Sequence, residues 1–142
     1  MVNYKLFCSM SCIFCQIVAK EIPNYTVYED ANCLAFLDIY PHAKGHTVVI
    51  PKNHAETIFD LDDENRSALF WAVKLTMEKI QLTLNPDGFN VGFNHGEAGG
   101  QAVPHLHFHI LPRYKNDCGG SMHSILPRTA EFSVEEICQL FK

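Results

Sequence analysis

Three histidines alternate with bulky apolar residues within residues 104–113, and this alternation constrains the fold more than any other feature of the chain. The histidines are His105, His107 and His109. The apolar residues between and after them are Leu106, Phe108 and Ile110. Successive side chains of a strand point to opposite faces, whereas a helix would scatter these residues around its circumference. The pattern predicts a strand over 105–111 with an apolar face toward a core and a row of imidazoles on the other face.

The composition excludes several broad classes of protein. The chain has 142 residues, of which 47% are hydrophobic and 19% charged, as expected for one soluble domain. The net charge of −5 argues against broad binding to nucleic acid, although a small anionic ligand remains compatible with local histidines and amides. No apolar run is long enough to span a membrane. Residues 1–15 lack a signal-peptide cleavage site and the six cysteines form no regular framework, so we expect a cytoplasmic protein with reduced thiols.

Hydrophobic periodicity predicts one sheet and one long helix. Strands are expected at residues 25–29, 33–39, 46–51, 89–94 and 105–111. Residues 62–84 form the long helix, because Asp62 and Asp63 favour its start and apolar residues recur at helical spacing. Short helices are expected near the two ends of the chain, at 13–19 and 134–141. With the helices packed to one side of the sheet, the fold class is α+β.

The row of histidines has three interpretations. An amphipathic strand could carry histidines on its polar face without any chemistry. Two of the histidines could hold a catalytic zinc ion and leave room for water, since His-x-His on a strand supplies two ligands. A neutral imidazole could instead attack an electrophile while its neighbours handle protons and charge, which suits a side chain whose pKa lies near neutrality.

A glycine-rich loop, residues 96–101, stands directly ahead of the histidine row. Its glycines are Gly96, Gly99 and Gly100. They permit positive φ and close backbone approach, so that several amides can converge on an anion. Gln101 adds a side chain able to contact an oxyanion. We therefore expect a phosphate to lie over His107.

The run of histidines resembles the His-φ-His-φ-His-φ-φ signature of the histidine triad (HIT) family, where φ is an apolar residue. Further segments follow the order and spacing of that family: 12–17, 20–23, 34–39, 45–54 and 94–105. The resemblance implies a HIT-like fold, an antiparallel sheet with one long helix and short terminal helices. It implies a single domain over 10–142, preceded by an extension over 1–9 in which Cys8 has no matching role.

The resemblance also implies a reaction, in which His107 attacks the α-phosphorus of a nucleoside phosphoramidate or a dinucleoside polyphosphate. The nucleotidyl-His107 intermediate is then hydrolysed and releases a nucleoside monophosphate. His109 would contact the phosphate and the leaving group, and the carbonyl of His105 would keep the far nitrogen of His107 protonated. His46 and Gln101 complete the implied catalytic set. Nucleophile positioning and neutralisation of phosphoryl oxygens supply most of the catalysis in phosphoryl transfer.

The implied nucleotide site has a ribose side, a base side and a phosphate side. Asp38 corresponds to the ribose-binding acid. The walls of the base pocket correspond to Ile13, Phe14, Ile17, Ile22, Phe36, Leu37 and Ile39. The phosphate side corresponds to Asn94, Gly100, Gln101, Ala102 and Val103, together with His107 and His109. Ala102 departs from the family, since many relatives carry a hydroxyl residue there.

The Cys-x-x-Cys pair resembles part of a structural zinc site found in some members of the family. The corresponding ligands are Cys12, Cys15, His54 and His105, and two thiolates with two imidazoles would complete a closed tetrahedral site. No organic cofactor is implied. The implied partners are a purine nucleotide, of the adenosine type, and a second copy of the chain in a homodimer. The alternative function is a nucleotide-binding regulatory module with little turnover, and His42, His95 and His123 are expected in surface loops.

Overall fold

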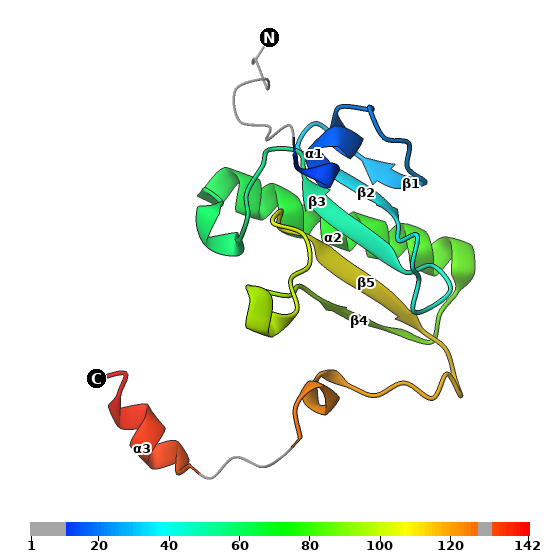
Figure 1. The fold of residues 1–142 in the computed structure, drawn as a ribbon. Helices are drawn as coiled ribbons and strands as arrows, with labels where there is room; N and C mark the ends of the chain where they lie inside the picture. The colour runs from blue at the N-terminus through cyan, green and yellow to red at the C-terminus, as the bar shows by residue number, and fades with distance from the viewer. Residues whose placement is uncertain (1–10, 128–131) are drawn as a thin grey trace.

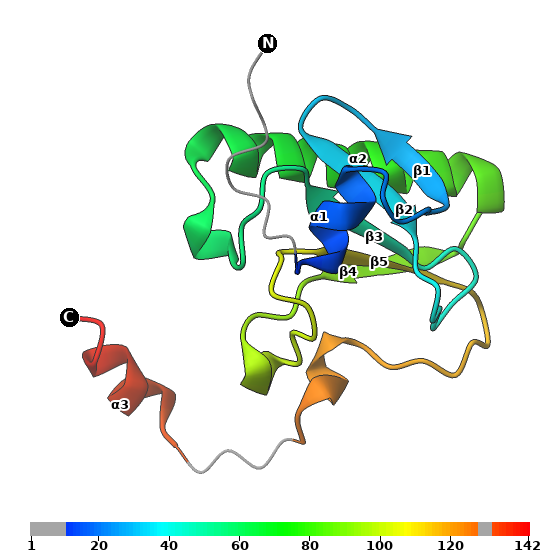
Figure 2. The same cartoon turned by 45° about the horizontal axis from the view of Figure 1, so that its top comes forward.

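A five-stranded sheet forms the centre of the computed structural model, which describes residues 11–127 and 132–142 (Figures 1 and 2). Its strands are β1 (Thr26–Glu29), β2 (Cys33–Leu37), β3 (Thr47–Pro51), β4 (Gly88–Gly92) and β5 (Phe108–Arg113). They lie in the order β1-β2-β3-β5-β4, and neighbouring strands are antiparallel. The α+β class and the antiparallel sheet predicted from the sequence are confirmed.

The long helix α2 (Asp63–Leu84) covers one face of the sheet (Figure 1). Asp62 caps it by accepting a hydrogen bond from the Asn65 N–H at 2.8 Å, and Asn85 ends it with a left-handed backbone, φ 46°. The helix buries a stripe spaced by three or four residues: Leu69, Ala72, Val73, Thr76 and Ile80. This stripe packs against residues of the sheet that include Ala35, Val49, Phe108 and Ile110. The main core therefore lies between α2 and the sheet.

The short helix α1 (Ile13–Val18) lies against the opposite face of the sheet, so the prediction that the helices pack to one side is wrong (Figure 2). A second apolar cluster joins Ile17 of α1 to Leu34, Phe36, Val48 and Ile50. β2 and β3 bury consecutive residues, because α2 covers one of their faces and α1 covers the other. The remaining short elements are η2 (Ile58–Asp60), η3 (Glu97–Gly99), η4 (Met122–Ile125) and α3 (Val134–Gln139).

β5 begins at Phe108, three residues later than predicted, so His105 and His107 precede the strand. β3 cannot extend the ladder to them, because Pro51 has no N–H and its carbonyl accepts a hydrogen bond from His105 Nε2 at 2.9 Å. The Leu106 N–H donates instead to Ala55 O at 2.7 Å. The predicted alternation of faces nevertheless holds, since Leu106, Phe108 and Ile110 all enter the core.

The predicted extension over 1–9, with Cys8, lies outside the described residues, and the start of the predicted domain at Met10 does as well. Within the described residues, no helix is both long enough and apolar enough to cross a membrane.

Two leucines of α2 test this packing. Leu69→Ala should lower the free energy of unfolding by about 2–5 kcal/mol, because Leu69 is fully buried between helix and sheet. Leu82→Ala is the matched control, since Leu82 is 88% exposed and its loss should cost less than about 0.5 kcal/mol. Urea unfolding of both variants measures the difference. Equal losses would contradict the assignment of the buried face.

Candidate active site

His107 is held by the backbone that precedes β5. Its Nδ1 lies 2.7 Å from the carbonyl oxygen of His105, so Nδ1 carries the proton and donates it to that carbonyl. The tautomer with the proton on Nδ1 bears its lone pair on Nε2. Phe14 of α1 packs edge-on to this ring at a centroid distance of 5.2 Å. The His107 ring is therefore buried, fixed in orientation and equipped with a nucleophilic nitrogen.

A chain of hydrogen bonds fixes the tautomer of His109. The His42 backbone N–H donates to His46 Nδ1 at 3.2 Å, so the proton of a neutral His46 ring is on Nε2. His46 Nε2 lies 2.9 Å from His109 Nδ1 and donates to it. His109 then carries its own proton on Nε2. The His109 ring lies 5.0 Å from the His107 ring, centroid to centroid, so a proton donor stands beside the candidate nucleophile.

Burial keeps the His46 and His109 rings neutral. Desolvation, reinforced by the neighbouring His107 and His46, lowers the pKa of His109 to about 4. Desolvation also lowers the pKa of His46, although the nearby Asp38 carboxylate opposes that shift. Asp38 Oδ2 lies 3.6 Å from His46 Nε2, while Asp38 Oδ1 accepts the Tyr40 N–H at 2.8 Å. Each ring therefore holds a single proton at neutral pH.

His46, His109 and Asp38 also form a cluster with metal-ligand atoms within 4.8 Å of one another. A metal on His46 Nε2 would require the ring proton to move to Nδ1. The Nδ1–H would then point at the His42 N–H, whose nitrogen lies 3.2 Å from His46 Nδ1, and the two protons would repel each other. The geometry therefore favours a hydrogen-bonded chain over a metal site at these three residues.

The glycine-rich loop adopts the conformation that requires glycine at two positions, Gly96 (φ 69°) and Gly100 (φ 87°), while Gly99 sits at the end of η3 without positive φ. Gln101 braces this loop: its Oε1 accepts the Gly96 N–H at 2.9 Å, and its Nε2 donates to two backbone carbonyls at 2.7 and 3.0 Å. The Gln101 amide is thus fully engaged within the protein, and an oxyanion contact would require one of these bonds to break. Asn94 is exposed and donates to Gly100 O at 3.4 Å.

The residues expected around the base divide into two groups. Four pack together on the α1 side of the sheet: Phe14, Ile17, Ile22 and Phe36. Three are exposed and offer apolar surface: Ile13 on α1, and Leu37 and Ile39 on either side of Asp38 in the chain. Ala102 is exposed and Val103 is half-buried, at the end of the glycine-rich loop.

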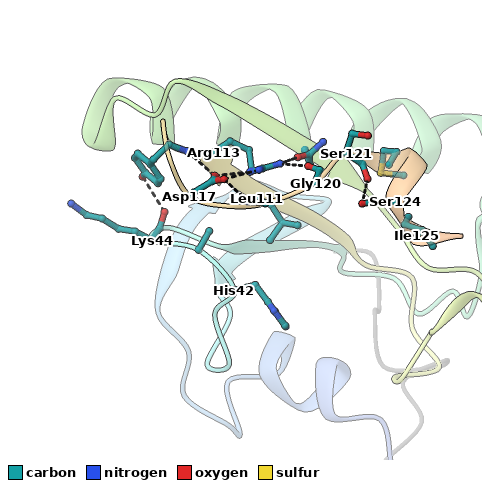
Figure 3. Close-up of a pocket in the computed structure, with 14 residues that line it drawn as sticks. His42, Lys44, Leu111, Arg113, Asp117, Gly120, Ser121, Ser124 and Ile125 are labelled. Carbon is teal, nitrogen blue, oxygen red and sulfur yellow. Dashed lines mark hydrogen bonds and ion pairs between the residues drawn. The ribbon is translucent and has the colours of Figure 1, made fainter. Parts of the chain in front are cut away.

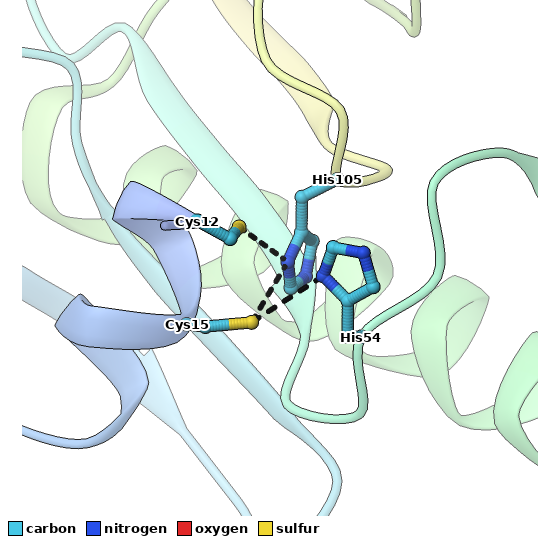
Figure 4. Close-up of side chains that lie close together, drawn as sticks. All are labelled: Cys12, Cys15, His54 and His105. Carbon is cyan, nitrogen blue, oxygen red and sulfur yellow. Dashed lines mark hydrogen bonds between the residues drawn. The ribbon is translucent and has the colours of Figure 1, made fainter. Parts of the chain in front are cut away.

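The structure brings the four predicted zinc ligands together (Figure 4). Their ligand atoms lie within 4.8 Å of one another, with Cys12 Sγ 3.5 Å from His105 Nδ1 and Cys15 Sγ 3.3 Å from His54 Nδ1. His105 donates its Nε2–H to Pro51 O, which leaves Nδ1 unprotonated toward the two sulfurs. Burial, as the largest cause, lowers the pKa of His105 to about 4, so the ring is neutral. Two cysteine sulfurs and two imidazole nitrogens in this arrangement suit a tetrahedral zinc ion, which binds cysteine as the thiolate.

Several groups of the site have no signal in the sequence. The Pro51 carbonyl and the His42 N–H set the protonation of His105 and His46, and backbone atoms are the same in nearly every residue. His42 and His95 were expected in surface loops; both are exposed, and both line a cavity beside His109. Met122 and Ile125, from the loop after β5, line it as well. Only a long-range fold brings these residues to the site.

The chain is similar to known proteins over most of its length. The HIT domain family model matches residues 19–116. Adenosine 5'-monophosphoramidase hnt1 of Schizosaccharomyces pombe is 40% identical over 137 residues, which cover 94% of this chain and 100% of that protein. The crystal structure of a HIT family member from Bacillus subtilis superimposes with a TM-score of 0.81 at 40% identity, over 92% of both chains.

One of the similar structures contains zinc. The crystal structure of a Zn-bound histidine triad family protein from Mycobacterium smegmatis matches 77% of this chain and 79% of its own, with a TM-score of 0.73 at 38% identity. Family model, relatives and fold agree with the histidine row and with the segments around it. The chain belongs to the histidine triad (HIT) family.

Proposed function

We propose that this chain is a nucleotide hydrolase or transferase that cleaves at the α-phosphorus through a covalent nucleotidyl-His107 intermediate. The observation that carries the proposal is the 2.7 Å contact between His107 Nδ1 and the carbonyl oxygen of His105, because it leaves the lone pair on Nε2. The position of His109 beside this ring supports a two-histidine mechanism. The HIT membership and the phosphoramidase name of the fission yeast relative agree with it.

In the first step, a bond forms between His107 Nε2 and the α-phosphorus, and the bond from phosphorus to the leaving nitrogen or oxygen breaks. The leaving atom departs with the proton from His109 Nε2. Nucleotidylation makes the His107 ring positively charged. This charge offsets the negative charge that loss of the proton leaves on the His109 ring, 5.0 Å away. Water then attacks phosphorus, and the bond from phosphorus to His107 Nε2 breaks, with its electron pair returning to that nitrogen. One proton of the water goes to His109 Nε2, and a nucleoside monophosphate is released.

The proposed substrate is a purine nucleotide of the adenosine type. Asp38 supports it, because its carboxylate lies near His46 and can accept hydrogen bonds from ribose hydroxyls. Apolar surface on Ile13, Leu37 and Ile39 supports a base beside that ribose. We further propose that the protein is cytoplasmic and forms a homodimer. Exposed Phe70 and Trp71 on α2, and the position of β4 at the edge of the described sheet, support the dimer.

A structural zinc ion completes the proposal. Cys12, Cys15, His54 and His105 would hold it, and it would join the start of α1 to the segments that follow β3 and precede β5. When bound, zinc supplies cross-linking and no reaction step. His105 would thus anchor both the metal and, through its carbonyl, the nucleophile.

The covalent intermediate can be tested directly. The wild type is incubated with adenosine 5′-phosphoramidate, quenched early, and analysed by intact mass and peptide mapping. A nucleotidyl adduct on His107 is expected. His107→Ala should lose the adduct and at least about 10⁴-fold in turnover, yet bind adenosine monophosphate, while exposed His123→Ala should behave as wild type. Normal hydrolysis by His107→Ala would refute the mechanism, and nucleotide binding without turnover in the wild type would favour a binding module.

The role of His46 as a positioning residue gives a second test. His46→Ala should lower kcat for an amine leaving group by about 10²–10³-fold, because His109 loses the donor that keeps its own proton on Nε2. The loss of kcat should be much smaller for a substrate whose leaving group is 4-nitrophenolate, because this group departs without a proton. Nitrogen-15 chemical shifts of His109 should show the Nε2–H tautomer in the wild type and a mixture in the variant. Equal losses for both leaving groups would indicate a general structural defect.

Removal of zinc distinguishes a structural ion from a catalytic one. Metal analysis should find about one zinc per chain, and chelation should lower stability by on the order of 3 kcal/mol while folded protein keeps measurable turnover. Cys15→Ser should lose the metal, whereas Cys118→Ser should retain it, because Cys118 is exposed and outside the cluster. Loss of all chemistry from protein that remains folded would support a catalytic zinc instead.

A further inference from the structure

Three cysteines among the described residues are buried, and their surroundings differ. Cys33 lies in β2, and burial raises the pKa of its thiol to about 12. Cys33 therefore stays a thiol, which is a poor nucleophile. Cys12 and Cys15 lie at the start of α1, where their sulfurs face the imidazoles of the metal cluster (Figure 4). Oxidation chemistry is therefore expected at this pair and not at the third buried cysteine.

The sulfurs of Cys12 and Cys15 are close enough to form a bond with each other. His105 Nδ1 lies 3.5 Å from Cys12 Sγ and 3.8 Å from Cys15 Sγ, and the two sulfurs lie within 4.8 Å of each other. A disulfide needs its sulfurs about 2.05 Å apart. The Cys-x-x-Cys spacing is also that of redox-active cysteine pairs. Rotation of the two side chains can therefore turn a pair of metal ligands into a disulfide.

We infer that Cys12 and Cys15 form a redox switch, in which a peroxide oxidises the pair to a disulfide and the protein loses its zinc ion and most of its turnover. This inference rests on the proposed function, because both the zinc site and the reaction belong to that proposal. Disulfides of cytoplasmic proteins are typically transient and redox-sensing, which agrees with a switch of this kind.

The oxidation balances with one molecule of hydrogen peroxide. The Cys12 thiolate, which is 5% exposed against 1% for Cys15, attacks a peroxide oxygen, and the O–O bond breaks. Cys12 becomes a sulfenic acid, and the departing hydroxide takes up a proton. The Cys15 thiolate then attacks the Cys12 sulfur, the S–O bond breaks, and a second hydroxide takes up a proton. Two thiolates, one peroxide and two protons thus give one disulfide and two water molecules.

The disulfide removes two of the four ligands. Zinc binds cysteine as the thiolate, and neither sulfur of a disulfide carries that charge. His54 and His105 remain as two neutral ligands, which is too few for a closed structural site. Oxidation should therefore release the metal.

Residues 54–56 connect the metal cluster to the candidate nucleophile. His54 is the ligand, and the carbonyl of the next residue, Ala55, accepts the Leu106 N–H at 2.7 Å. Leu106 directly precedes His107 in the chain. Loss of the bond from His54 to the metal would therefore loosen the support of the backbone that holds His107.

The same segment braces the glycine-rich loop. The carbonyl of Glu56 accepts a hydrogen bond from Gln101 Nε2 at 2.7 Å, and Gln101 Oε1 accepts the Gly96 N–H at 2.9 Å. Three consecutive residues thus link the metal cluster, the nucleophile and the proposed phosphate loop. Because small displacements of reacting groups cost much of the rate, release of the metal should lower turnover.

Cys118 offers a matched control, since it is exposed and belongs to the loop after β5. It follows Asp117, whose two carboxylate oxygens accept hydrogen bonds from Arg113 Nε and Nη2 at 2.7 Å (Figure 3). The four ligands of the metal cluster come from other segments. Cys118→Ser should therefore release zinc under peroxide as the wild type does.

The switch is tested on zinc-loaded wild type treated with hydrogen peroxide. A chromogenic chelator measures zinc release, and alkylation with peptide fragmentation locates the disulfide. We expect zinc release, a disulfide between Cys12 and Cys15, and Cys33 still a thiol. Cys8→Ser removes another thiol near the pair in the sequence and should give the same disulfide. The value of kcat/KM for adenosine 5′-phosphoramidate should fall about tenfold and return after treatment with dithiothreitol and zinc.

Cys12→His separates metal binding from oxidation. It replaces a sulfur ligand by a nitrogen that zinc also accepts, and a single remaining cysteine in the cluster cannot form the disulfide. The variant should keep zinc and turnover under peroxide. If the larger side chain prevents folding, the mapping of the wild type still decides, because the disulfide either forms there or does not.

The outcomes separate the switch from the proposed reaction. Retention of zinc by oxidised wild type, a disulfide that joins other cysteines, or release of zinc from Cys12→His at the wild-type rate would overturn the switch. Release of zinc with unchanged kcat/KM would also overturn it, as would failure of the reduced protein to bind zinc. If the disulfide forms and zinc is released, but the reduced, zinc-loaded protein cleaves no phosphoramidate, the proposed reaction is overturned and the oxidation chemistry stands.

Discussion

The rest of the site depends on His105, which makes three interactions in three directions. Its Nε2–H donates to Pro51 O, its Nδ1 faces Cys12 and Cys15, and its carbonyl oxygen accepts the proton of His107 Nδ1. The residue is fully buried, so each of these bonds operates away from water. A displacement of His105 would disturb the metal cluster and the candidate nucleophile together. The segment before β5 therefore positions both the metal cluster and the candidate nucleophile through one residue.

Burial defines the protonation of the neighbouring rings. Desolvation lowers the pKa of His109 to about 4, and it lowers that of His46 as well, so each ring holds one proton at neutral pH. A neutral imidazole has two tautomers, and a single fixed donor suffices to choose between them. The His42 N–H makes that choice for His46, and His46 passes it to His109. Orientation of protons is thus built into the fold before any nucleotide binds.

His109 shares its surroundings with the glycine-rich loop. Glycines of this loop have positive φ, and the Gln101 amide holds its shape. The cavity beside His109 is lined by residues of β4, of β5 and of the segment after β5, and Gly99 of the loop lines it as well. Residues far apart in the sequence therefore line one cavity next to the histidine row.

The sequence by itself determined the α+β class and a long helix that begins near Asp62 and Asp63, because hydrophobic periodicity is a local property. The histidine row also follows from alternation along a strand, whereas the other side chains of the site were expected from the resemblance to the family. Only the tertiary structure decided that α1 covers the face opposite α2, that β5 begins at Phe108, and which nitrogen of each histidine carries its proton. His105 finds its acceptor 54 residues away, and His46 meets His109 across 63 residues. The groups that decide which nitrogen carries each proton are largely backbone N–H and C=O groups. These groups are the same in almost every residue and therefore leave no pattern in a sequence.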